Sequence, residues 1–303
     1  MIASENLKKT AVIASENLKE IAKGYSFQTV KDTYTILEQI KKTSTNKNLQ
    51  SQNKKNIILI TTTFILLTGI GVFYLNYQTN PNQYDSNSFK TNYLIQNLKG
   101  DTVDTWVSWR LVEGSIINVN LIDGEKYPDK LEIVRMVLSS EESIEIDDSL
   151  LQKGPKGTTS TYYVGWAGAL ASTSKNPTKF YIPHEFNVIE SPKGEGDITI
   201  KLISQSNGDG YSGYTKSIVD DAQNQILKSE ITIYEVDKLS KAQFETILRH
   251  EFGHALGLAH STAPEDLMAP VITTNYPYIS ECDLDAIHHL YDGGESSKVV
   301  CEK

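Results

Sequence analysis

The spacing of three histidines within one short segment constrains this chain more than any other feature of its sequence. His250 and His254 are four residues apart, His260 follows, and Glu251 and Gly257 lie between them. A spacing of four is about one helical turn, so the first two imidazoles project from the same face of a helix. Glycine adopts positive φ at little steric cost, so Gly257 can end that helix and turn the chain back toward His260.

This spacing predicts a metal site with an adjacent carboxylate. Ser240 and Gln243 have the form of a capping box, which places the start of the helix at Lys241. Three neutral imidazoles with an open fourth position describe a catalytic zinc site, in which the pKa of the bound water falls toward ~7. Glu251 adjoins the first ligand and is placed to take the proton of that zinc-bound water, so we expect hydrolysis of a peptide bond. The alternative is a helix with incidental surface histidines.

The extended motif resembles the zinc signature of the metzincin metallopeptidases, and among them that of the matrixins. Residues 250–261 read HEFGHALGLAHS, and residues 266–270 read DLMAP, which is similar to the Met-turn of that family. Residues 279–291 read ISECDLDAIHHLY and are similar to the helix that closes a matrixin catalytic domain, with Ser280 as its cap. The resemblance is sharp over residues 241–291 and extends loosely back to Trp106.

The resemblance implies a fold and a role for individual residues. It implies an α/β (α+β) domain with a twisted mixed sheet, an active-site helix, a C-terminal helix and a small lower subdomain after Gly257. It implies zinc ligation by the three histidines, catalysis by Glu251, and a methionine, Met268, beneath the site. Substrate would lie extended along an edge strand. By position only, that strand falls near Gly213–Ile218, and the pattern identifies no individual substrate-binding residue.

The chain also departs from the matrixin pattern. The upstream histidines and aspartate that hold a structural zinc in vertebrate matrixins are missing, and His184 is the only histidine in that region, so we expect no second zinc. No cysteine precedes Cys282, so the cysteine-switch motif is absent. Asn207 and Asp209 are candidates for calcium ligands, but Asn-Gly and Asp-Gly pairs are also ordinary turn sequences, and we prefer the turn. The remaining histidines, His288 and His289, have no ligand-like spacing.

A long apolar run upstream predicts a membrane anchor. Ile57–Leu75 contains no charge and no proline. Nineteen helical residues span about 28 Å, close to the hydrocarbon thickness of a bilayer. Lys47, Lys54 and Lys55 precede the run, so the positive-inside bias places the N-terminus in the cytoplasm and the main domain outside. The alternative is a buried core helix, which seldom extends this far without a polar face.

The remaining sequence divides around this anchor. We expect a cytoplasmic helical segment over residues 1–55, in which IASENLK occurs twice, and a transmembrane helix over 56–76. Residues 77–104 are rich in Asn, Gln, Ser and Tyr and predict a linker. The metallopeptidase domain is expected over 105–292, followed by a C-terminal tail over 293–303.

Patterning within the domain predicts alternating strands and helices. Strands are expected at residues 115–122, 197–204 and 230–236, with a further short strand after the glycine-rich loop at 206–217. A helix is expected at Lys130–Leu138, with Pro128 near its first turn. Residues 141–180 have no assignable element, because Gly, Ser, Thr and Pro interrupt the pattern.

The distribution of charge limits the kinds of binding partner that we expect, and the two cysteines leave two alternatives open. Residues 1–55 carry 10 lysines and 5 acidic residues, a net charge of +5. Because the whole chain has a net charge of −9, the remaining residues carry −14. An acidic main domain argues against nucleic acid and leaves protein or peptide substrates and, through residues 57–75, the lipid bilayer. Cys282 and Cys301 form either a disulfide or two free thiols. A catalytically inactive metzincin-like domain acting as a binding or sensor module is the alternative function, and no pattern specifies an oligomeric state.

Overall fold

The computed structural model describes residues 88–151 and 153–301. The predicted cytoplasmic segment, the apolar run at 57–75 and the first part of the predicted linker lie outside the described residues. Within the described ranges, no helix combines the length and the apolar character needed to cross a bilayer.

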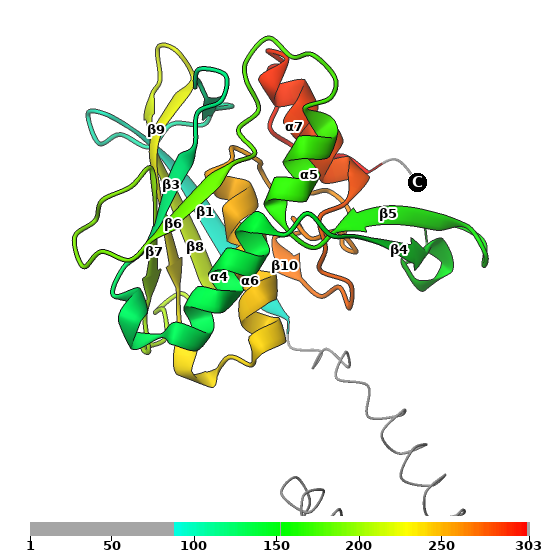
Figure 1. Cartoon of the computed structure of the whole chain (residues 1–303), viewed down its shortest axis with the longest axis horizontal. Helices are drawn as coiled ribbons and strands as arrows, with labels where there is room; N and C mark the ends of the chain where they lie inside the picture. Colours follow the sequence, from blue (N-terminus) through cyan, green and yellow to red (C-terminus); the bar gives the residue numbers. More distant parts are fainter. Residues whose placement is uncertain (1–87, 152, 302–303) are drawn as a thin grey trace, which may run out of the picture. The chain divides into compact units, whose positions relative to one another are not determined.

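One mixed sheet forms the larger part of the domain (Figure 1). Its strands run in the order β10-β1-β8-β9-β7-β3-β6, with β2 attached to β9. Their bounds are β1 Phe89–Asn97, β2 Ser108–Trp109, β3 Ile117–Leu121, β6 Phe186–Ile189, β7 Ile198–Leu202, β8 Gly213–Asp220, β9 Gln225–Ile233 and β10 Val271–Ile272. Only the β8–β9 and β1–β10 pairs are antiparallel. The other pairs are parallel, as expected for strands joined by crossover connections.

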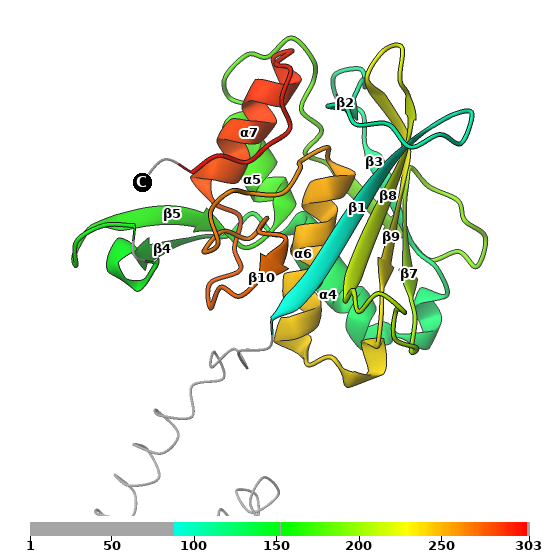
Figure 2. The same ribbon diagram turned by 180° about the vertical axis from the view of Figure 1, so that it is seen from behind.

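Two helices pack on one face of this sheet (Figures 1 and 2). They are α4, Pro128–Ser139, and α6, Lys241–Ala255. The central strands bury short runs of β-branched residues beneath them, including Val119, Ile200 and Ile231, each with no exposed surface. This core fixes the position of α6, the helix that carries the first two motif histidines.

A smaller layer follows on the other side of α6. It contains the antiparallel hairpin of β4, Ser143–Asp147, and β5, Thr159–Tyr163, with helices α5, Trp166–Thr173, and α7, Glu281–Tyr291. Three short 3-10 helices complete the described elements, at Gly124–Lys126, Asp148–Leu151 and Val236–Lys238. The hairpin and α5 lie in residues 141–180, where the sequence pattern predicted no element.

The predicted elements near the motif are confirmed. Helix α6 begins at Lys241, and its N-terminus has the expected capping box, in which Ser240 accepts from the Gln243 N–H and Gln243 accepts from the Ser240 N–H. Helix α7 has the same device at Ser280 and Asp283. The mixed α/β fold class is confirmed for the described residues, which contain four α-helices.

Residues 89–97 correct two expectations. They were predicted to belong to a linker, but they form β1, which pairs with β8 from Thr91 to Asn97. Consequently β8 lies between β1 and β9, and the predicted edge strand at Gly213–Ile218 is not an edge in this structure. The polar composition of residues 89–97 suggested a stalk, but this segment pairs instead with the backbone N–H and C=O groups on the side of β8 away from β9.

The C-terminal residues are integrated into the domain. Cys282 and Cys301 form a disulfide, one of the two alternatives that the sequence left open. The loop after α6 bonds to the same segment, since the Ala259 N–H donates to Ser297 and the Thr262 N–H donates to Val299. The predicted tail therefore supports the loop that carries His260.

The turn after α6 is closed by a Schellman motif. The Gly257 N–H donates to the His254 carbonyl at 3.0 Å, and the Leu258 N–H donates to the Gly253 carbonyl at 3.0 Å. Gly257 has φ of 107°, and a Cβ built there would collide with the backbone oxygen of Val107. Only glycine satisfies both requirements, which explains the residue at this position.

We predict that Gly257→Ala lowers the free energy of unfolding by at least about 2 kcal/mol, because left-handed φ and a backbone collision both disfavour a Cβ. Urea titration of the full-length chain, followed by circular dichroism, measures this loss. Gly208→Ala is the matched control, since a Cβ at Gly208 meets nothing within 4 Å. Equal midpoints for the two variants would contradict this account of the turn.

Candidate metal centre

Helix α6 is held at its C-terminal end by side chains from distant segments. The Trp109 indole N–H donates to the Ala255 carbonyl at 3.0 Å, and the Tyr291 hydroxyl donates to the Leu256 carbonyl at 3.2 Å. These bonds satisfy carbonyls that a helix end leaves without an intrahelical partner. They also fix the last turn of the helix, where His254 lies.

The structure brings the three motif histidines together. One ring nitrogen from each of His250, His254 and His260 lies within 4.8 Å of the others. The ring centroids of His250 and His254 are 4.7 Å apart, and those of His254 and His260 are 4.8 Å apart. Helical spacing supplies the first pair, and the Gly257 turn supplies the third ring.

Hydrogen bonds set the orientation of two of these rings. Nδ1 of His250 lies 2.7 Å from the Leu267 carbonyl oxygen, and Nδ1 of His254 lies 2.7 Å from the Leu258 carbonyl oxygen. A carbonyl only accepts, so each Nδ1 carries the proton and each Nε2 presents a lone pair. Within the described residues, Nε2 of His254 and of His260 is buried without a hydrogen-bond partner.

Burial keeps the imidazoles neutral. It lowers the pKa of His250 to about 3 and that of His260 to about 4. The pKa of His254 lies well below its ordinary value, first because of burial and then because of its two histidine neighbours. Neutral nitrogen donors, two of them buried without a protein partner, fit a zinc ion, for which this donor set is typical.

Glu251 lies beside the histidines and is fully buried. Its Oε2 accepts a hydrogen bond from the Thr215 hydroxyl at 2.6 Å, whereas its Oε1 has no partner among the described residues. Burial raises the pKa of this carboxyl well above its ordinary value, and the bond from Thr215 lowers it in part. A Cβ at Gly213 would collide with Oε1, so the bare backbone of β8 makes room for this carboxylate.

Met268 packs against helix α6 at Gly253, between the first two motif histidines in sequence. It has no exposed surface, and a Cβ built at Gly253 would meet its sulfur at 2.5 Å. Its carbonyl accepts from the Ser261 N–H, and its own N–H donates to Asp266 Oδ1 at 2.8 Å. Asp266 also accepts from the Ser280 hydroxyl at 2.9 Å, which ties the methionine turn to the start of α7.

The sequence analysis missed three residues at the site: Thr215, which bonds to Glu251 from β8, and two residues on β1. The Thr91 hydroxyl is 2.9 Å from Nε2 of His250. The Tyr93 ring stacks on His254 with centroids 4.4 Å apart and meets His260 edge-on at 5.2 Å. The run of strand-forming residues from Tyr93 to Ile95 could have predicted a strand here. Nothing in that run indicates a contact with the histidines.

The other predicted candidates lie in ordinary structural settings. Asn207 Oδ1 accepts from the Asp209 N–H at 2.8 Å, which is the bonding of the turn that we preferred to a calcium site. His184 Nδ1 contacts the Ile182 carbonyl at 3.1 Å, and His288 and His289 lie on α7.

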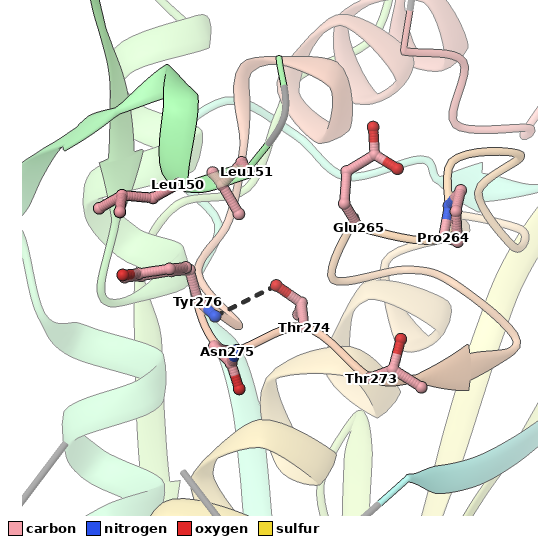
Figure 3. Close-up of a pocket in the computed structure, with 8 residues that line it drawn as sticks. All are labelled: Leu150, Leu151, Pro264, Glu265, Thr273, Thr274, Asn275 and Tyr276. Atoms are coloured by element: carbon pink, nitrogen blue, oxygen red, sulfur yellow. Dashed lines mark hydrogen bonds between the residues drawn. The ribbon is translucent and has the colours of Figure 1, made fainter. Parts of the chain in front are cut away.

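A separate pocket lies between Asp148–Leu151 and the segments on both sides of the methionine turn (Figure 3). Its volume is about 290 Å³. It is lined by Leu150, Leu151, Pro264, Glu265, Thr273, Thr274, Asn275 and Tyr276. One hydrogen bond within the lining, from the Tyr276 N–H to the Thr274 hydroxyl at 3.1 Å, shapes its wall. None of the motif histidines is among these residues.

Comparison with known proteins matches this region to one peptidase family. Residues 169–292 match the family model Peptidase_M10, described as Matrixin. Human matrix metalloproteinase-20 is 33% identical over 120 residues, which cover 36% of this chain and 24% of that protein. Canine matrix metalloproteinase-9 is 52% identical over 46 residues, 15% of this chain and 6% of that protein.

A plant protein gives a similar match. Metalloendoproteinase 2-MMP of Arabidopsis thaliana is 27% identical over 111 residues, 31% of this chain and 29% of that protein. The chain therefore spans less than a third of the length of these relatives. The matched part contains the histidine cluster, the methionine turn and helix α7.

We predict that the full-length chain retains about one zinc ion after dialysis, and that His254→Ala loses it, because two imidazoles leave the tetrahedral set incomplete. Metal analysis of the dialysed proteins measures this directly. Zinc at 100-fold over its dissociation constant should also raise the free energy of unfolding by about 2.7 kcal/mol. His289→Ala, at an exposed position on α7, is the control. A chain that stays metal-free in excess zinc would rule out this centre.

Proposed function

We propose that this chain is a zinc-dependent metalloendopeptidase of the matrixin kind. One observation carries the proposal: three neutral imidazoles, two of them buried and the third half-buried, converge within 4.8 Å of one another, and a buried carboxylate lies next to them. The match of residues 169–292 to the matrixin family supports the same reaction class. In this proposal His250, His254 and His260 hold the metal.

Bound zinc would polarise the scissile carbonyl and acidify a water molecule. The protein contributes the proton acceptor, Glu251, whose unpartnered Oε1 is free to take a proton from water and to pass it to the leaving amine. Thr215 holds the other carboxylate oxygen in place, so the side chain does not need to reorient during the reaction. The buried surroundings exclude bulk water from this proton transfer.

We also propose that the substrate is an extended peptide that pairs with β8. Strand β8 lies next to Glu251 through Thr215, and β8 and β10 both pair with β1, the extended strand between them, which would have to give way to a substrate. Main-chain pairing of this kind recognises peptides through their backbone, with limited dependence on side chains.

Glu251→Gln should keep zinc but reduce peptide cleavage by about 10²–10⁴-fold, because the amide cannot accept the proton while the metal ligands are unchanged. Digestion of a peptide library by the zinc-loaded full-length chain, with and without a chelator, measures this effect. Glu245→Gln applies the same change at a site on the first turns of α6, where the carboxylate pairs with Lys241, and should cleave normally. Undiminished activity of Glu251→Gln would remove the general-base role, and the inactive binding-module alternative would be favoured if no form of the protein cleaved peptide.

We further propose that residues 57–75 anchor the protein in the cell membrane, with the N-terminus cytoplasmic and the catalytic domain outside. The uncharged sequence of this run and the lysines that precede it support this topology.

The anchor is tested by Leu66→Lys combined with Leu67→Lys, since each lysine costs about 2.5–3.5 kcal/mol near the centre of a spanning helix. The double variant should move from the membrane fraction to the soluble fraction after an alkaline wash. Leu98→Lys, at a position that is 69% exposed, should not. Recovery of the unaltered chain in the soluble fraction would refute anchoring.

A further inference from the structure

Strand β1 lies in the position where an extended substrate would have to bind. On one side it pairs with β8 at seven positions, from Thr91–Gly213 to Asn97–Val219. On the other side Phe89 and Lys90 pair with β10. Figure 2 shows β1 along the side of the sheet that faces helix α6. The chain's own segment therefore takes up the hydrogen-bonding groups of both walls.

Side chains of the same strand cover the histidine cluster. The Thr91 hydroxyl contacts Nε2 of His250, and the Tyr93 ring lies against His254 and His260. Residues two apart on a strand point to the same face, so both side chains reach the cluster from one strand in one register. The contacts that β1 makes with the imidazoles come from a side-chain hydroxyl and an aromatic ring, so β1 covers the centre through side chains.

Further contacts hold β1 at both ends. The Ser212 N–H donates to the Lys90 carbonyl at 2.8 Å, and the Lys90 ammonium lies 4.6 Å from the centroid of the Tyr211 ring. At the other end, the Asn97 amide donates to Asp221 Oδ2 at 3.2 Å. The strand is thus fixed by the same loops that flank β8.

The strand is nevertheless a peripheral part of the core. Only Phe89, Thr91 and Asn97 are buried, and the intervening side chains from 92 to 96 are half-buried. An exposed tip, residues 98–102, joins β1 to the rest of the domain. Removing β1 would expose the edge of β8 while leaving the pairing of β8 with β9 and the packing of α6 on the sheet intact.

We propose that Phe89–Asn97 is an inhibitory strand, which occupies the peptide-binding edge and the metal centre and must leave before a substrate enters. This inference rests on the proposed function and adds its regulation. The protein is then predominantly closed, and its apparent affinity for any ligand of the centre is reduced by the fraction of molecules in which β1 has left.

The test uses the zinc-loaded full-length chain and two readouts. The first is the affinity for a small hydroxamate, which chelates an accessible zinc ion, measured by calorimetry. The second is the rate of peptide-library cleavage. Thr91→Ala combined with Tyr93→Ala removes both side chains from the imidazoles, and Asn92→Ala, whose side chain points to the opposite face of the strand, is the matched control.

The double variant should bind hydroxamate at least about tenfold more tightly than the unaltered chain, as expected if the open fraction rises from about a tenth to nearly all molecules. Cleavage should accelerate in parallel, and Asn92→Ala should match the unaltered chain in both readouts. Equal hydroxamate affinity in all three proteins would overturn the inhibitory role, even if all of them cleave peptide. Tighter hydroxamate binding without cleavage by any of them would support the inhibitory role and refute the peptidase proposal.

A second measurement does not depend on the folding of a variant. Hydrogen exchange of the unaltered, zinc-loaded chain should accelerate at the amides of residues 89–97 when a saturating peptide hydroxamate is added, because the inhibitor displaces the strand. Unchanged protection of these amides in the inhibitor complex would show that β1 and a ligand occupy the centre together, which overturns the inference.

Discussion

The reversal of the chain at Gly257 is the constraint on which the histidine cluster depends. A helix alone aligns His250 and His254, but its continuation would carry His260 away from them. The left-handed φ of Gly257 and the two Schellman hydrogen bonds stop α6 and direct the chain back. Hydrogen bonds from Trp109 and Tyr291 and the disulfide-linked C-terminal segment stabilise this turn.

Burial gives this cluster its chemical character. Imidazoles removed from water keep their lone pairs for a metal ion, since protonation in that environment is unfavourable. The same burial disfavours the charged form of Glu251, and a nearby cation together with the Thr215 hydroxyl would compensate for it. The metal centre and its carboxylate are therefore interdependent: each group relieves the cost of burying the other.

Strand β8 lies next to Glu251 through Thr215, and on the side away from β9 it pairs with the protein's own segment 89–97. Without that segment, the N–H and C=O groups along this side of β8 would be unpaired, which favours any strand that can align with them. Segment 89–97 satisfies these groups and also places Thr91 and Tyr93 on the histidines. The groups through which this segment reaches the histidines are therefore a hydroxyl and an aromatic ring.

The local sequence by itself determined helix α6, its cap at Ser240, the turn at Gly257 that ends it and the grouping of the three histidines. These features depend on interactions between residues a few positions apart, where spacing translates directly into geometry. Only the tertiary structure decided the role of residues 89–97, the covering of β8 and the hydrogen bond from Thr215 to Glu251. These features depend on contacts between segments that are distant in the sequence. Thr91 and His250, for example, are more than a hundred residues apart. A polar segment is suited by its composition to solvent or to a sheet, and the pairing partner that β8 offers decides between them.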